Sequence, residues 1–70
     1  MTVTVNGIER SYEKAGISVH ELLMGEEGVP LGLVSVQING DIIDSKLYKN
    51  TNLKNGDRVE YAYFMGGGAG

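Results

Sequence analysis

The chain has 70 residues, so it forms one domain at most, because domains typically contain about 100–200 residues. Its six basic and nine acidic residues give a net charge of −3, which argues against nucleic acid and anionic membrane surfaces as partners. It contains no cysteine, and this excludes a disulfide scaffold, an iron–sulfur cluster, a zinc knuckle and a thiol nucleophile.

The chain begins with a predicted β-hairpin. Residues 1–5 alternate apolar and polar side chains with a period of two, which predicts a half-buried strand. Asn6-Gly7 favours a two-residue type I′ turn, because both central positions of that turn need positive φ. Residues 8–14 form the expected return strand, and their charged side chains suit the edge of a sheet.

A short helix is predicted next. Residues 18–21 form a capping box, in which the Ser18 hydroxyl accepts from an orphan amide and Glu21 reaches back three residues. The helix is expected to end at Gly25 or Gly28, after two or three turns. Because so short a helix is marginal in water, it must pack on a sheet. Its apolar face consists of Val19, Leu22 and Leu23.

The second half of the chain reads as three more strands. Residues 33–38 form a strand, and Asn39-Gly40 turns it into a short strand at 41–43. Residues 44–52 are polar and predict a loop with one helical turn. A third turn at 55–57 leads into the most hydrophobic strand, at 58–65.

These elements predict an α+β domain in which a mixed sheet of four to five strands packs on one helix. The domain spans residues 1–65, and 66–70 form a flexible glycine-rich tail.

The polar side chains give little sign of catalysis. His20 has no second histidine for a metal site and no nucleophile to activate, so we interpret it as a solvated helix residue. The pairs Glu26-Glu27 and Asp41 with Asp44 lie in polar, turn-like sequence, which favours solvated surface charge over acid–base chemistry. No stretch is apolar enough to span a membrane and the start lacks a signal peptide, so a cytoplasmic location is expected.

The glycines at the end of the sequence allow two interpretations. Four of the last five residues are glycine: Gly66, Gly67, Gly68 and Gly70. They could simply form a frayed terminus. Alternatively, they form an arm that threads a narrow channel, since glycine has no Cβ, and presents an ionised terminal carboxylate as the working group.

The sequence resembles the ThiS/MoaD family of ubiquitin-like sulfur carrier proteins, and ThiS more than MoaD because it is short. No single segment is specific, but the segments occur in the family's order and spacing along nearly the whole chain. They are VTVNG at 3–7, SVHELL at 18–23, VQINGDII at 36–43, LKNGDRVE at 53–60 and GGG at 66–68.

The resemblance implies a β-grasp fold and a carrier that is not itself an enzyme. In that fold we expect the last strand to be central, with the strand at 33–38 antiparallel beside it. The side chains then expected to cover the helix are Val3, Val5, Val34, Val36, Val59, Tyr61 and Tyr63. In this family, a ThiF/MoeB-like adenylating enzyme uses ATP to activate the tail carboxylate, and the carrier binds no cofactor of its own. A sulfur donor then forms a thiocarboxylate, which supplies a synthase such as thiazole synthase in thiamin synthesis. Sulfur donation to molybdopterin synthesis, modification of other proteins, and a plain β-grasp interaction module are the alternatives.

The tail departs from the family pattern in one respect. Family members usually end at the Gly-Gly pair, whereas here Gly67-Gly68 is followed by Ala69-Gly70. Either Gly70 supplies the carboxylate directly, or removal of two residues exposes Gly68. A third alternative is that the carrier has lost or changed its chemistry.

A docking surface is expected beside the tail, on a carrier that is monomeric when free. Leu33 and Phe64 should lie close together, because the start of one antiparallel strand lies beside the end of its neighbour. An apolar spot near a reactive tail fits a partner site, although single exposed hydrophobic residues are also common. The expected docking residues are Leu33, Ala62, Phe64 and Met65.

We therefore expect Phe64→Asp to lower the rate at which the adenylating enzyme activates the tail. A carboxylate placed in an apolar contact must be desolvated, and this weakens docking. The measurement is the initial rate of ATP-dependent adenylation, and an unchanged rate would contradict the predicted surface.

Overall fold

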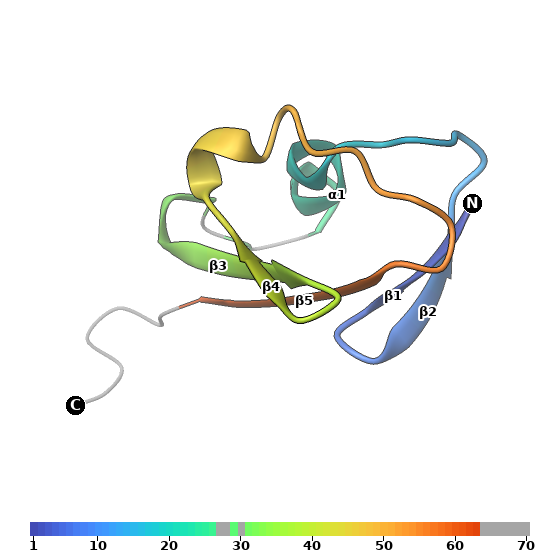
Figure 1. Cartoon of the computed structure of the whole chain (residues 1–70), viewed down its shortest axis with the longest axis horizontal. Coiled ribbons are helices and arrows are strands. Elements are labelled where there is room, and N and C mark those ends of the chain that lie inside the picture. Colours follow the sequence, from blue (N-terminus) through green and yellow to red (C-terminus); the bar gives the residue numbers. More distant parts are fainter. Residues whose placement is uncertain (27–28, 30, 64–70) are drawn as a thin grey trace.

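A computed structural model describes residues 1–26, 29 and 31–63, and the strands among them form one five-stranded sheet in the order β2-β1-β5-β3-β4 (Figure 1). Strands β1 and β5 run parallel, and the other neighbours are antiparallel. The helix α1 lies on one face of this sheet (Figure 1). The predicted two-layer α+β arrangement is therefore confirmed. In chain order the elements are β1 (Thr2–Val5), β2 (Ile8–Ser11), α1 (Val19–Met24), η1 (Leu31–Leu33), β3 (Val34–Ile38), β4 (Asp41–Ile43), η2 (Ser45–Leu47) and β5 (Arg58–Tyr63).

The first hairpin forms as predicted, but its return strand is shorter. Asn6 and Gly7 have φ values of 51° and 83°, as a type I′ turn requires. The ladder ends at the Thr2↔Ser11 pair rather than continuing to residue 14. Beyond that pair, the Met1 amine donates to the Tyr12 carbonyl, and the Tyr12 N–H donates to the Met1 carbonyl, both at 2.8 Å. The return strand stops there because β1 offers it no further partner.

The helix begins at the predicted capping box. The Glu21 N–H donates to Ser18 Oγ at 3.0 Å, and the Ser18 N–H donates to Glu21 Oε1 at 3.2 Å. The bond from the Ser18 N–H, with a smaller contribution from Lys14, lowers the pKa of Glu21. The helix has six residues, fewer than the predicted two or three turns, and it ends at Gly25 rather than Gly28. Within the described residues, no helix is long and apolar enough to cross a membrane.

The hydrophobic core lies between the sheet and the helix, and it includes residues that the sequence pattern did not indicate. Ile17, Tyr48 and Leu53 are buried, although the apolar residues around them follow no regular period. The Tyr48 hydroxyl donates to the Val34 carbonyl at 3.3 Å, which ties the loop around η2 to the start of β3. The buried hydrophobic residues are Val3, Val5, Ile17, Val19, Leu22, Leu23, Val34, Val36, Tyr48, Leu53 and Val59.

Two predicted positions near the end of the sheet are corrected. Tyr63 was expected in the core but is 37% exposed, because β5 extends past the short helix at this end (Figure 1). Leu33 was expected to begin a strand but is the last residue of η1, and β3 begins at Val34. The last strand ends at Tyr63 in the described part of the chain, and residues 64 and 65 lie outside it.

We expect Leu53→Ala to lower the free energy of unfolding by about 2–5 kcal/mol, because the side chain is fully buried and its loss leaves a cavity. Leu47→Ala is the matched control. Leu47 is 50% exposed and belongs to the same connection, so its truncation should change stability by no more than about 0.5 kcal/mol. Urea unfolding of both variants measures the difference, and equal losses would contradict this core.

Candidate functional site

The candidate site lies where β5 leads toward the glycine-rich tail. Phe64, Met65, the glycines 66–68 and Gly70 lie outside the described residues. The structure does place the other two predicted docking residues, Leu33 and Ala62. Leu33 is 53% exposed and directly precedes Val34, which pairs with Tyr63. It therefore lies at the end of the sheet where the tail begins.

Strand β5 is central in the sheet, as predicted, and its two neighbours hold it over different lengths. On one side, β3 pairs with it from Ile38↔Val59 to Val34↔Tyr63. On the other side, β1 pairs only at Thr4↔Arg58 and Val5↔Val59. Among the described strands, β3 is thus the only one that pairs with the part of β5 nearest the tail.

Asn6 ends the pairing between β1 and β5. Its N–H donates to the Val59 carbonyl at 2.9 Å, and its Oδ1 accepts the Tyr61 N–H at 2.8 Å. The sequence predicts Asn6 only as a turn residue and does not reveal that its side chain also accepts a hydrogen bond from β5. The available signal was its position directly after a strand, where a short carbonyl-bearing side chain can replace the next backbone acceptor.

The other two Asn-Gly dipeptides place their asparagines in the same way. Asn39 Oδ1 accepts the Arg58 N–H at 2.9 Å, at the start of β5. Asn55 Oδ1 accepts the Thr2 N–H at 2.8 Å, at the start of β1. Asparagine side chains therefore complete the hydrogen bonding of β1 and β5 at three points where a backbone neighbour ends.

A shallow hollow of about 260 Å³ lies on the sheet face opposite the helix, beside this end of β5. Ser35 and Ala62 face each other across β3 and β5, and both are small, exposed residues. Gln37 and Glu60 form the next pair of these two strands on the same face of the sheet. The residues that line the hollow are Asn6, Ser35, Gln37, Glu60, Tyr61 and Ala62.

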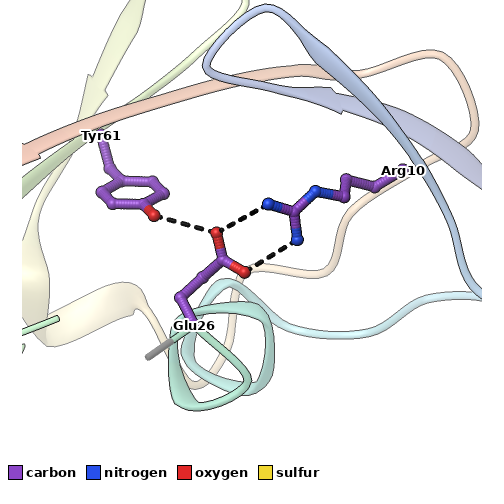
Figure 2. Close-up of polar contacts among 3 residues, drawn as sticks. All are labelled: Arg10, Glu26 and Tyr61. Atoms are coloured by element: carbon purple, nitrogen blue, oxygen red, sulfur yellow. Dashed lines mark hydrogen bonds and ion pairs between the residues drawn. The ribbon is translucent and has the colours of Figure 1, made fainter. Parts of the chain in front are cut away.

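On the helix side, Glu26 forms a polar cluster with Arg10 and Tyr61 (Figure 2). Glu26 Oε2 accepts from Arg10 Nη1 at 2.9 Å, and Oε1 accepts from Arg10 Nη2 at 3.4 Å and from the Tyr61 hydroxyl at 2.9 Å. The Glu26 side chain is only 12% exposed. The expectation that Glu26 is a solvated surface charge is therefore wrong, because donors from β2 and β5 surround it. Glu27 lies outside the described residues.

The remaining candidate side chains do not converge on a reactive centre. His20 is half-buried on α1, Asp41 is exposed on β4, and Asp44 caps η2 by accepting the Lys46 N–H at 2.9 Å. Among residues 1–26, 29 and 31–63, no three His, Asp or Glu side chains are grouped so that they could hold a metal ion.

Comparison with known proteins identifies the family. The model of the ThiS family matches residues 3–68. The chain belongs to the ThiS family. The crystal structure of thiamine biosynthesis protein ThiS from Geobacter metallireducens has a TM-score of 0.83 and 36% identity, and the match covers 97% of this chain and 100% of that one. This likeness confirms the ubiquitin-like β-grasp fold.

Two further relatives agree with this placement. The solution structure of a thiamine biosynthesis protein from G. metallireducens has a TM-score of 0.77 and 38% identity, and covers 97% of this chain and 88% of that one. A thiazole synthase from Paramagnetospirillum magneticum is 36% identical over 69 residues, or 99% of this chain. Those residues are 21% of that protein, so the chain spans about a fifth of its length. Membership of the ThiS family of small carrier proteins supports a sulfur-carrier role.

Tyr61→Phe should lower the free energy of unfolding by about 1 kcal/mol at pH 7, because the variant loses one hydrogen bond to the Glu26 carboxylate. Burial, and then Glu26, raise the pKa of Tyr61 above its ordinary value of about 10. The folded state thus favours the neutral phenol. The stability that the neutral Tyr61 phenol contributes is present in full below pH 10 and is lost as pH rises through the folded-state pKa of Tyr61.

The variant should therefore lose less stability than the wild type between neutral pH and pH above 10. Urea unfolding as a function of pH measures this difference, with Tyr63→Phe as the control on the same strand. Burial also raises the pKa of Tyr48, so part of the alkaline loss remains in both variants. An alkaline loss in Tyr61→Phe equal to that of the wild type would contradict the assignment.

Proposed function

We propose that this protein is a sulfur carrier whose tail carboxylate is activated by an adenylating enzyme and converted to a thiocarboxylate. A carboxylate oxygen attacks the α-phosphorus of ATP and expels pyrophosphate, which gives an acyl-adenylate. A sulfur donor then attacks the acyl carbon, and AMP leaves with the carbon–oxygen bond electrons. The activation is needed because direct attack on a carboxylate would have to expel an oxide.

The observation that carries the proposal is the family match, which runs through the glycine pair Gly67-Gly68. The described structure supports it in a second way. The tail follows a strand that lies in the centre of the sheet, paired on both sides at its start. A folded domain followed by a glycine-rich segment suits delivery of one reactive group to the sites of two different enzymes, because glycine has no Cβ to block a narrow channel.

The similarity to a thiazole synthase supports thiazole formation in thiamin synthesis as the use of the sulfur. About a fifth of that relative resembles this chain, so a carrier-like segment is part of a protein named for the synthase. We accordingly propose three partners: a ThiF/MoeB-like adenylating enzyme, a sulfur donor and a thiazole synthase. The carrier acts in the cytoplasm as a monomer when free, binds no cofactor and leaves the use of ATP to the adenylating enzyme.

Two glycines are candidates for the acceptor. Gly70 supplies the carboxylate if residues 69 and 70 are kept, and Gly68 supplies it if they are removed. The matched family region ends at Gly68, which favours the shorter form.

Intact-mass measurement tests the proposed chemistry. The protein is purified from its native host, then incubated with ATP, a sulfur donor and the adenylating enzyme, and its last residue is mapped. We expect a product in which sulfur replaces one oxygen, ending at Gly68 or at Gly70.

A parallel reaction without ATP is the control and should give no such product. Adducts of higher mass on lysines of other proteins would instead indicate a protein modifier. A chain that stays unmodified under all conditions would overturn the carrier function and leave a β-grasp interaction module.

A further inference from the structure

We propose that the open edge of β5 beside Asn6 accepts an extended segment of the partner that processes the tail, by addition of a strand to the sheet. The inference rests on the proposed function, since it concerns how that partner grips the carrier. The main-chain groups that we expect to contact the partner are the Tyr61 carbonyl and the Tyr63 N–H.

The direction of the backbone groups along β5 follows from its hydrogen bonds toward β1. The Asp57 carbonyl accepts from the Thr4 N–H at 3.0 Å, and the Val59 carbonyl accepts from the Asn6 N–H at 2.9 Å. Two residues further, the Tyr61 N–H donates to Asn6 Oδ1 at 2.8 Å. Because strands alternate, the Tyr61 carbonyl and the Tyr63 N–H face this same side.

No strand of the described structure continues along this side of β5. The turn at Asn6-Gly7 sends the chain back into β2, which pairs on the far side of β1. The backbone groups of Ala62 face the opposite side of β5, where Ala62 pairs with Ser35 of β3. The edge is therefore open at Tyr61 and Tyr63 while the other side of the strand remains occupied.

The hollow on the outer face lies beside this open edge and adds a second observation. Asn6 and Tyr61 belong to both features. The small side chain of Ala62 leaves room on the outer face of β5 for an outward-facing side chain of an added strand. Glu60 is the one charged residue in the lining, so a basic side chain of the partner fits this position.

An extended partner segment suits this edge better than a side-chain pocket would. The tail contains glycines, which offer a partner no side chains to recognise, so an enzyme that holds the tail must use its main chain. The edge at residues 61–63 directly precedes the tail in the chain. A partner segment that pairs with this edge is therefore in position to contact the main chain of the tail as well. Main-chain pairing then supplies affinity, and the hollow supplies specificity.

Hydrogen exchange followed by NMR tests the contact on the unmodified full chain. We expect the Tyr63 amide to exchange at least about tenfold more slowly when the adenylating enzyme and ATP are added. Adenylation without protection of this amide would overturn strand addition and leave the proposed function intact. Absence of both adenylation and protection would overturn both. Protection that depends on carrier concentration without enzyme would indicate a second copy of the chain and overturn the proposal.

A matched pair of variants tests the same N–H independently. Tyr63→Pro removes the N–H that faces the open edge and keeps the bonds to β3, whereas Tyr63→Val retains it with a side chain suited to strands. Tyr63→Pro should bind the enzyme at least about tenfold more weakly than Tyr63→Val. Equal binding by the two would show that the N–H makes no contact. Thermal unfolding checks that both variants fold. If the proline variant does not fold, the hydrogen-exchange measurement on the unmodified chain decides the proposal.

Discussion

The pairing of β1 with β5 joins the two ends of the described chain, and most other features depend on it. Only two residue pairs form this parallel ladder, and asparagine side chains extend it on both strands. It places β5 in the centre of the sheet and closes the face on which α1 packs. The six-residue helix could not persist by itself, since isolated helices of that length are unstable in water. Because the ladder joins residues far apart in sequence, it also carries a large loop-closure cost during folding.

Local sequence chemistry predicted the elements of this fold well. Each Asn-Gly dipeptide marks a turn. Asn6 and Asn39 adopt positive φ together with their glycines, whereas at the third dipeptide only Gly56 does. The capping box located the first residue of α1 because its hydrogen bonds join residues only three apart. The family resemblance predicted the central position of the last strand and its antiparallel neighbour, which local patterns do not contain.

The parts that the sequence did not reveal all depend on contacts between distant residues. Tyr48 and Leu53 belong to the core because their loop folds over the helix, and isolated apolar residues have no period to indicate this. The Glu26 cluster joins residues from β2, α1's end and β5, so no local pattern could distinguish it from surface charge. The roles of the asparagine carbonyls are hidden in the same way. At the candidate site, the outward face of Ala62 on β5 could be predicted because strand alternation is regular, whereas Leu33 lies in η1, which the strand pattern did not indicate.

The central position of β5 also has a mechanical consequence. A partner that draws the tail into its own site pulls β5 along its axis. The hydrogen bonds to β1 and β3 lie across that axis, so the load is shared among them in shear rather than opening them one at a time. An edge strand would instead peel from the sheet under a sideways force. The central position of β5 thus suits it to carry tension along the chain, and the sheet can keep its shape under such a load.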